Sequence, residues 1–382
     1  MDFALSAPED AFLAEVRAFV RDRVAPTAAD IDRTAAYPRD LMREAAALGL
    51  AGVTLPVAWG GAGRRTVLYA FAIEAIALGS ATLAVSLVVH NSLAVEPIVE
   101  FGTSGQHEAW LRRLGSGEAL GAFALSEPDA GSDAANQQTT AREEGGGYVL
   151  NGMKTWVANA AAADVALVIA VTDPDAGSRG LSAFLVPLDA RGVTRSPLDS
   201  LGVRGLGCMD VAFDHVRVPA DARLGGAGQG WKIAMRALEG GRVAIAAQAL
   251  GVGQAALDEA VAYARTREAF GVPIGTFQAI QFQMADLVTD LEAARLLMWR
   301  AADARDRQPR ARVEAAMAKL QASEAAHRAA DRAMQILASA GYRRGSTIER
   351  LFRDARAAEI YQGTSEVQRM VIAHGIVGAV EP

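Results

Sequence analysis

The sequence predicts a multidomain α+β protein in which two helical regions flank a central β-domain. Residues 8–118 place apolar side chains three and four positions apart, which is the spacing of an amphipathic helix. Over residues 119–225 the pattern changes to short β-branched and aromatic runs separated by turn residues. The helical spacing returns at Trp231 and persists to the C-terminus. A chain of 382 residues suits two or three domains. We expect an N-terminal α-helical domain, a central β-barrel-like domain and a C-terminal four-helix-bundle domain, at residues 1–118, 119–225 and 226–382.

In the first region, one apolar stripe follows the helical spacing: Phe12, Val16, Phe19, Val20 and Val24. Pro38 and Gly49 bracket a short helix at 39–48. Glycine density marks 59–63 as a loop. Residues 83–101 form a mostly buried helix, which Pro97 is expected to kink.

The central region predicts an all-β domain of antiparallel strands, because its apolar runs follow one another without intervening helices. Turn residues such as Asn151-Gly152 separate the runs. The expected strands are 121–125, 148–150, 165–171, 181–186 and 211–218.

The last region predicts a helical bundle. Alanine and glycine are frequent in 242–266, which permits close approach between helices. Residues 310–340 form a long alanine-rich amphipathic helix, and a turn between Gly341 and Gly345 precedes a last helix near 365–377.

Composition narrows the classes of function. The net charge of −6 gives no basic field to attract nucleic acid. Cys208 is the single cysteine, which excludes an internal disulfide framework and a multi-cysteine metal site. The apolar runs are shorter than the roughly 20 residues of a membrane span, and the N-terminus lacks a secretory signal pattern. We therefore expect a cytoplasmic protein, or a mature protein of an organelle matrix.

Two segments of the β-domain are candidate binding elements. Residues 124–133 leave a strand and enter a Gly/Ser turn, whose N–H groups and hydroxyl suit a phosphate or the carbonyl edge of a flavin, although an ordinary surface loop has the same composition. In 154–159, Trp156 can stack on a ring or fill the core.

Two further candidates lie in the C-terminal region. In 263–271, followed by 277–281, Arg267 offers a fork for a pyrophosphate or is a solvated surface arginine. The Gly-Thr-Ser turn in 360–369 also fits a helix N-cap.

Taken together, these segments, in this order and spacing, resemble the acyl-CoA dehydrogenase family over essentially the whole chain. The run 237–243, followed by 248–251, is most similar to the short-chain, butyryl-CoA type. The resemblance implies FAD bound between the β-domain and the C-terminal helices, a homotetramer in which neighbours share the cofactor site, and electron-transfer flavoprotein as the electron acceptor. The implied reaction removes the α-proton of an acyl thioester and passes the β-hydrogen as hydride to flavin N5.

The resemblance also implies roles for individual residues. Those expected along the flavin are Phe123, Leu125, Ser126, Trp156, Val157 and Ala158. Those expected to reach the FAD of a neighbouring chain are Arg267, Phe270, Gln278 and residues 335–339, including Gln335 and Ser339. Thr364 and Glu366 are expected over the phosphates and adenosine. Those expected around the substrate are Ser132, Glu239, Arg242 and Gly363.

The residue at the position of the catalytic base departs from the family. Most relatives carry a glutamate immediately before the Gly-Thr turn, and this chain has Gln362. An amide does not accept a proton near neutral pH, and general-base catalysis is worth about 10²- to 10⁴-fold. Some relatives place the glutamate before the arginine that matches Arg242, but that position is Gly241 here. The backbone N–H of residue 362 is still expected to stabilise the enolate-like charge.

Two smaller departures concern the cofactor. Ala158 stands where the family usually has a threonine that bonds flavin N5, and Ala338-Ser339 stands where two glycines are usual. The first removes a donor, whereas the second affects a contact that is largely to the backbone.

Three explanations of Gln362 stay open. It is a deliberate substitution made to trap a substrate complex, a natural divergence toward different flavin chemistry, or a change for which another carboxylate or His90 compensates. Glu96 lies among apolar residues and can shorten or polarise the acyl cavity. The leading hypothesis is a dehydrogenase of short or branched acyl-CoA; the alternatives are a reductase or oxygenase on the same scaffold and a catalytically silent FAD- or CoA-binding protein.

Overall fold

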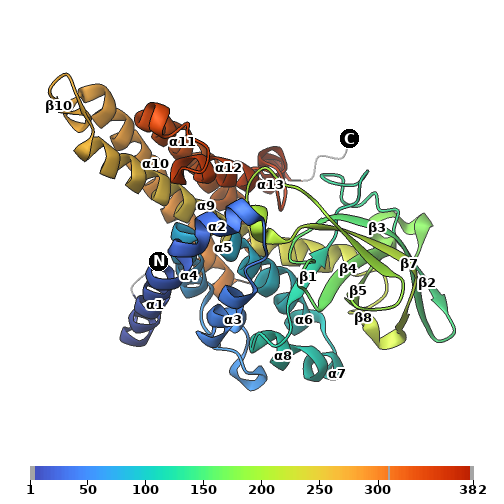
Figure 1. Cartoon of the computed structure of the whole chain (residues 1–382). Coiled ribbons are helices and arrows are strands. Elements are labelled where there is room, and N and C mark those ends of the chain that lie inside the picture. The colour runs from blue at the N-terminus through green and yellow to red at the C-terminus, as the bar shows by residue number, and fades with distance from the viewer. Residues whose placement is uncertain (1–4, 309, 379–382) are drawn as a thin grey trace.

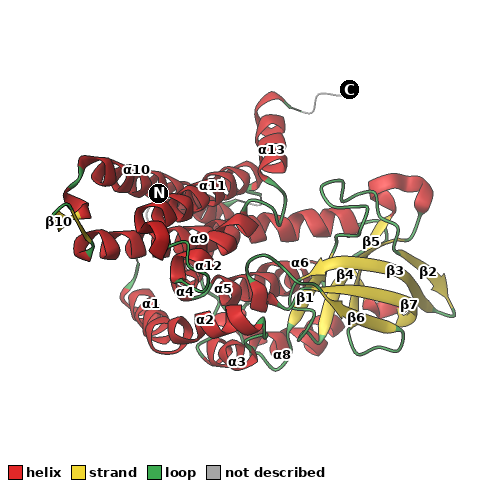
Figure 2. Ribbon diagram, turned by 45° about the horizontal axis from the view of Figure 1, so that its top comes forward, coloured by secondary structure: helices red, strands yellow, loops and turns green. Residues whose placement is uncertain are grey.

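The computed structural model describes residues 5–308 and 310–378. Its β-sheet lies at one end of the molecule, and three long helices extend away from it toward a small hairpin at the opposite end (Figures 1 and 2). The three helices are α9 (Gly230–Thr266), α10 (Gln278–Arg307) and α11 (Arg312–Leu337). The expected three-part architecture is confirmed, with helices before and after a central sheet. The boundaries proposed at 118/119 and 225/226 remain predictions.

The N-terminal region is helical, as its apolar spacing predicts. The predicted helix at 39–48 is α3 (Arg39–Ala47), and Gly49 after it has a left-handed φ of 79°. Part of the predicted loop at 59–63 is a short 3₁₀-helix, Val57–Trp59, before the turn. The other α-helices are α1 (Ala7–Phe19), α2 (Ala25–Thr34), α4 (Thr66–Gly79), α5 (Ala81–Val88), α6 (Glu96–Phe101), α7 (Ser104–Gln106) and α8 (Arg112–Gly115).

Helices α5 and α6 join through a π-helical segment, Val89–Val95, into one helix over Ala81–Phe101. Pro97 lies in the first turn of α6, where its missing N–H is tolerated, and the helix widens in the residues before it. With 21 residues this helix is long and apolar enough to cross a membrane, so the expectation that no segment has that length was wrong. However, 89% of its apolar window is buried inside the protein, which makes it a core helix.

The central sheet has eight strands, in the order β6-β7-β3-β2-β4-β5-β8, with β1 paired to β4. The prediction of antiparallel strands holds for most pairs, but β1 and β4 run parallel, and β2 meets β4 in parallel at one position. The strands that the sequence did not predict are short or polar: β2, β6 and β8. The strand bounds are β1 (Gly121–Ala124), β2 (Thr140–Glu144), β3 (Gly147–Val157), β4 (Val165–Val171), β5 (Leu181–Pro187), β6 (Val193–Pro197), β7 (Met209–Pro219) and β8 (Arg223–Leu224).

Strand β4 explains how the sheet and the helices form one body. Its residues Val165, Leu167 and Ile169 pack in the main core together with the helices. The alternate residues Ala166, Val168 and Ala170 pack in a second core inside the sheet domain. Because both faces are buried, the strand is a continuous apolar run without polar alternation.

The C-terminal helices approach closely where α9 lacks side chains. A Cβ on Gly251 would lie 2.4 Å from the carbonyl oxygen of Glu74 on α4, and one on Gly253 would lie 2.7 Å from Leu291 on α10. The predicted last helix is α13 (Ser365–Val377), and α12 (Thr347–Ala358) precedes it. A small hairpin, β9 (Glu268–Ala269) and β10 (Val272–Pro273), joins α9 to α10.

Candidate functional site

The turn between α12 and α13 carries Gln362, the residue at the predicted position of the base. Gln362 and Gly363 both have left-handed backbones, with φ of 54° and 95°. A left-handed φ is uncommon for a residue with a side chain, and such residues cluster at functional sites. The preceding Tyr361 anchors the turn, since its hydroxyl donates to Oε1 of Gln248 on α9 at 2.7 Å.

The side-chain amide of Gln362 lies against Gly241 of α9. A Cβ built on Gly241 would lie 2.1 Å from Gln362 Oε1 and 2.9 Å from Cδ2 of Leu93. The two alternative positions of the family's glutamate therefore face one another across the same space. Gln362 Oε1 is buried and has no hydrogen-bond partner among the described residues. A buried acceptor without a donor is costly, and it marks a place where a ligand or water is expected.

Three buried side chains donate hydrogen bonds to the carbonyl groups of the turn. The Gln362 carbonyl accepts from Arg242 Nε at 3.4 Å and from Gln368 Nε2 at 3.3 Å. The Gly363 carbonyl accepts from Gln368 Nε2 and from Lys319 Nζ, both at 2.8 Å. Within the described chain, the N–H groups of Gln362 and Gly363 have no such partner. The turn therefore keeps two backbone donors available to a substrate oxygen.

A second cluster joins the two predicted flavin-lining segments. Lys154 Nζ is fully buried and donates to the Leu125 carbonyl at 3.1 Å and to Glu127 Oε1 at 2.6 Å, and also to Gln137 Oε1. The N–H of Thr155 donates to the carbonyl of Ser126 at 2.9 Å. Segments 125–127 and 154–157 consequently lie side by side.

Near that cluster on β3, Trp156 is exposed, whereas the next residue, Val157, is buried. The indole residue is 55% exposed and has a φ of 55°, whereas Val157 is 1% exposed. Phe123 is half-buried on β1, Ala158 is half-buried after β3, and Ser132 is exposed in its loop. An indole held open on a rigid strand fits the flat ring of a flavin.

The loop 201–208 connects this part of the sheet domain to the turn at 362. The Asn159 N–H donates to the Leu206 carbonyl at 3.1 Å. The Val203 N–H donates to Oδ1 of the buried Asp354 on α12 at 2.6 Å. Ala158, Cys208 and Tyr361 all pack against the same core, so the predicted flavin and base segments belong to one rigid region.

His90 does not replace the missing base. It is fully buried, Nδ1 accepts from the Gly121 N–H at 3.1 Å, and Nε2 lies 3.1 Å from the carbonyls of Ala51 and Leu114. Burial lowers the pKa of its imidazole to about 4, so the ring is neutral at physiological pH. Since both ring nitrogens are engaged, His90 is a packing residue.

Two carboxylates that the sequence places near the substrate, Glu96 and Glu239, are also engaged. Glu96 Oε2 accepts from Arg305 Nη2 at 2.9 Å. Glu239, expected near the substrate, accepts from Arg236 Nη1 and from the Ala311 N–H, both at 2.8 Å. Among the residues that the structure describes, no carboxylate therefore forms a hydrogen bond with Gln362.

The other predicted cofactor residues lie at two places. Arg267, Phe270, Gln278, Gln335 and Ser339 are all exposed, with Phe270 97% exposed. Their elements share a small core at the end of the bundle. Figures 1 and 2 show that the hairpin of this end lies opposite the sheet. Within one chain these residues are therefore separate from the sheet domain.

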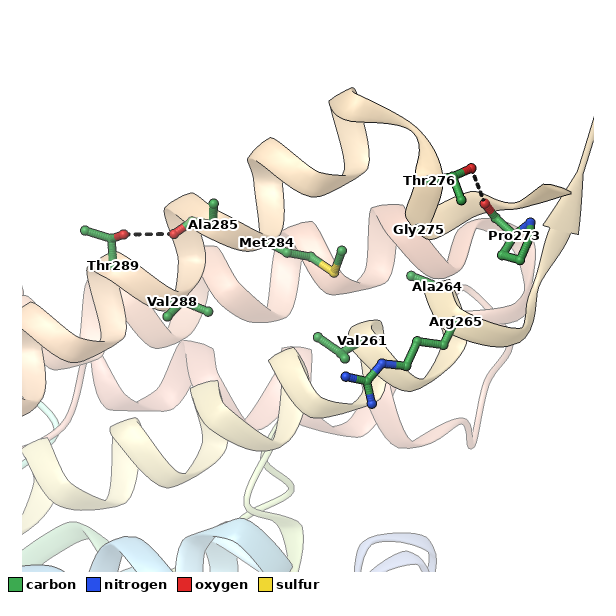
Figure 3. Close-up of a pocket in the computed structure, with 10 residues that line it drawn as sticks. All are labelled: Val261, Ala264, Arg265, Pro273, Gly275, Thr276, Met284, Ala285, Val288 and Thr289. Atoms are coloured by element: carbon green, nitrogen blue, oxygen red, sulfur yellow. Dashed lines mark hydrogen bonds between the residues drawn. The ribbon is translucent and has the colours of Figure 1, made fainter.

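Next to this hairpin, the ends of α9 and α10 diverge and leave a surface hollow (Figure 3). Val261 and Arg265 project from α9 and Met284 from α10. None of the residues predicted around the substrate lines it. The hollow thus adjoins the segment expected to contact a neighbouring chain.

A second, polar pocket opens at the start of α13. Its lining includes Thr364, Glu366, Arg356 and Arg369. Thr364 caps α13, since its hydroxyl accepts from the Val367 N–H at 3.4 Å. Ser365 Oγ is buried there without a partner in the described chain. The helix N-terminus and this hydroxyl favour an anionic group such as a phosphate. The two arginines are already paired with carboxylates of the same lining, Arg356 with Glu359 and Arg369 with Glu324.

Sequence reasoning missed Lys319 and Gln368, which hold the turn, and the anchoring role of Lys154. A signal for Lys319 was present. It is a lysine inside an alanine-rich stretch, Ala315, Ala316, Ala318 and Ala322, on the face of the helix that the pattern assigns to the core.

Comparison with known proteins agrees with this geometry. The N-terminal, middle and C-terminal domain models of acyl-CoA dehydrogenase match residues 6–118, 122–216 and 228–377. The short-chain specific acyl-CoA dehydrogenase of Homo sapiens mitochondria is 47% identical over 358 residues, 94% of this chain and 87% of that protein. A 3-(aryl)acrylate reductase of Clostridium sporogenes is 42% identical over 362 residues, 94% of this chain and 96% of that protein.

Among solved structures, butyryl-CoA dehydrogenase from Megasphaera elsdenii superposes with a TM-score of 0.96 at 39% identity, covering 99% of this chain and all of that one. The resemblance inferred from the motifs is thereby confirmed, as is its FAD cofactor. This chain belongs to the acyl-CoA dehydrogenase family and is a flavoprotein oxidoreductase of that family.

Proposed function

We propose that this protein oxidises short or branched acyl-CoA thioesters between Cα and Cβ, with an amide at the position where a carboxylate ordinarily accepts the α-proton. The observation that carries this proposal is the buried, unpartnered Oε1 of Gln362 beside Gly241. The N–H groups of Gln362 and Gly363, which have no partner within the described chain, support a place for a thioester carbonyl next to that atom.

FAD, when bound, supplies the acceptor for the hydride. The residues expected to hold it are those beside Trp156 and those lining the polar pocket at Thr364. The chain's own part in the reaction is to bind the thioester carbonyl through the Gln362 N–H and to keep Cα dry and close to side chain 362. Because the amide does not accept the proton, we expect α-proton removal to be slower than with a glutamate by about 10²- to 10⁴-fold.

The exposed residues of the hairpin support a homo-oligomer, proposed as a tetramer. Phe270 is 97% exposed and Val272 of the same hairpin is 39% exposed, and a group of exposed apolar side chains is costly to leave in water. In this proposal Arg267, Phe270, Gln278, Gln335 and Ser339 contact the FAD of a neighbouring copy. Electron-transfer flavoprotein is the proposed electron acceptor, and the cytoplasm is the proposed location.

The test is anaerobic mixing of the FAD-loaded protein with butyryl-CoA and isovaleryl-CoA, following loss of the flavin absorbance near 450 nm. We expect slow bleaching in the protein as it exists and a gain of about 10²- to 10⁴-fold in Gln362→Glu, because a glutamate in this buried place has a raised pKa suited to a base. Gln308→Glu, which adds a carboxylate on an exposed position, is the matched control and leaves the rate unchanged.

Gly241→Glu sharpens this test. Its Cβ would meet the end of the Gln362 side chain, so that side chain must move before the new carboxylate reaches the same space. We expect a gain smaller than that of Gln362→Glu. Failure of both variants to bleach with any acyl-CoA would contradict the proposal.

The runner-up is a protein that binds FAD and acyl-CoA without turning them over, and the observation favouring it is the lack of a carboxylate at both residue 362 and Gly241. Tight binding of acyl-CoA with no bleaching over hours would establish it. Chemistry of another kind on this scaffold, such as reduction or oxygenation, is favoured by Ala158, which has no hydroxyl for the flavin. Consumption of oxygen by the reduced protein, or turnover of enoyl-CoA with an external reductant together with no bleaching by any acyl-CoA, would identify that case.

A further inference from the structure

Lys319 is a fully buried lysine that pairs with no carboxylate of the described residues. It lies on α11 among buried alanines, and Nζ donates to the Gly363 carbonyl at 2.8 Å. No ion pair of Lys319 occurs within the part of the chain that the structure describes. A buried ammonium group is expensive to desolvate, so an arrangement that points it at a single backbone carbonyl calls for a reason.

The reason suggested by the geometry is the conformation of the turn. Lys319, Gln368 and Arg242, from three different helices, donate to two successive carbonyls, those of Gln362 and Gly363. Lys319 and Gln368 are 0% exposed and Arg242 is 5% exposed. Fixing both carbonyls fixes the backbone torsions between them. These torsions are those of Gly363, and the peptide plane of the Gln362 carbonyl also carries the Gly363 N–H. On the other side of Gln362, Tyr361 is anchored to Gln248, so that Gln362 is held between two fixed neighbours.

We propose that Lys319 is a positioning residue, whose ammonium group holds residues 362–363 in the left-handed conformation that presents the Gln362 N–H to the thioester carbonyl. This inference rests on the proposed function, because it assigns that N–H to a thioester. It assigns no contact between Lys319 and the substrate.

The charge of Lys319 is set by groups on every helix packed around it. Burial, and then the guanidinium of Arg242 on α9, lower the pKa of Lys319 to about 7. Three carboxylates oppose the shift: Glu359 after α12, Glu324 on α11 and Glu366 on α13. Because a charge-assisted hydrogen bond is about twice as strong as a neutral one, the hold on the Gly363 carbonyl weakens as pH rises through 7.

The experiment compares two ligands that differ only at the carbonyl. Crotonyl-CoA carries the thioester, and its but-2-enyl thioether has a CH₂ group in place of C=O. Their dissociation constants are measured by calorimetry on the oxidised, FAD-loaded protein at pH 6, 7, 8 and 9. The ratio of interest is the dissociation constant of the thioether divided by that of crotonyl-CoA. It reports the carbonyl interaction alone, because the ionisation of CoA cancels.

We expect this ratio to fall about fivefold from pH 6 to pH 9 with a midpoint near 7, the size of the difference between a charged and a neutral hydrogen bond. In Lys319→Met we expect a ratio that does not change with pH and that is no larger than the ratio of the unaltered protein at pH 9. Lys319→Arg, which stays charged, flattens the profile as well and shows that a folded variant loses the step. Lys232→Met, which removes an exposed lysine of α9, keeps the original profile.

A ratio that does not change with pH in the unaltered protein overturns the inference, as does Lys319→Met with an unaltered step. If neither ligand binds, the result contradicts the proposed function and therefore also the inference that rests on it. Binding of both ligands without discrimination removes the inference alone. The two failures are therefore distinguishable.

Discussion

Two buried lysines lie beneath the two halves of the site, and they differ in how their charge is balanced. Lys154 donates to the Leu125 carbonyl and to the carboxylate of Glu127. Lys319 donates to the Gly363 carbonyl and has no carboxylate partner in the described chain. Each is close to a residue with a left-handed φ. Lys154 lies two residues before Trp156, and Lys319 donates to the carbonyl of the residue that follows Gln362.

The two lysines differ in whether their charge changes near neutral pH. We call Lys154 with Glu127 the fixed support, and Lys319 the adjustable support. Burial lowers the pKa of Lys154 to about 8, with Glu127 opposing the shift, whereas burial and Arg242 together lower that of Lys319 to about 7. Burial raises the pKa of Glu127, but Lys154 and hydrogen bonds outweigh it, so the net shift is downward. The segment beneath Trp156 is therefore held by an ion pair at neutral pH, and the turn at Gln362 is held by a group that titrates there.

The largest expected effect comes from breaking the fixed support. Glu127→Gln leaves the Lys154 ammonium group buried without its counter-charge and should lower the free energy of unfolding by about 3–5 kcal/mol. Chemical denaturation measures it. The matched control is Glu144→Gln in the same domain, which breaks an exposed pair with Arg217 and should cost at most about 1 kcal/mol. Equal costs for the two variants would contradict the role given to the Lys154 cluster.

A smaller effect should distinguish the adjustable support. Between pH 7 and 10.5, Lys319 is protonated in the unfolded chain but not in the folded one, so unfolding takes up a proton and stability rises with pH. From pH 7 to 8, the window before Lys154 contributes, the free energy of unfolding should rise about 1 kcal/mol more in the unaltered protein than in Lys319→Met. Denaturant titrations at constant FAD concentration give both slopes. Parallel curves would show that Lys319 does not titrate in this range.

The smallest effect concerns Ala338, a strained residue whose carbonyl accepts from backbone N–H groups and from no lysine of the described residues. Ala338 has φ of 53° and ψ of −131°, a conformation that favours glycine, and its carbonyl accepts from the N–H groups of Gly341 and Tyr342. Ala338→Gly should stabilise the protein by about 1 kcal/mol, seen as a rise in Tm. Ser339→Gly, at a neighbouring position with no left-handed φ, should be neutral or slightly destabilising. A gain from Ser339→Gly equal to that from Ala338→Gly would refute strain as the cause.

Particular residues show how far the sequence reaches toward the site. Trp156 and Gln362 were found from motifs, and both have a left-handed φ, Trp156 near the end of β3 and Gln362 in the turn before α13. The roles of the residues assigned by resemblance, from Phe123 to Glu366, remain predictions that ligand-bound experiments must test. His90 was a reasonable candidate base from its position, but hydrogen bonds from three distant segments show that it is engaged in packing.

The sequence by itself determined the order of helical, β and helical regions, because side-chain periodicity is a local property of consecutive residues. It also determined the family and the amide at residue 362, because motif order is written along the chain. Only the tertiary structure decided that Lys319 meets Gly363 and that Gln362 faces Gly241. It also decided that Lys154 pairs with Glu127, whereas Lys319 pairs with no carboxylate in residues 5–308 and 310–378. Those facts depend on contacts between residues far apart in the chain, and burial, which sets the ionisation of the two lysines, exists only once those contacts have formed.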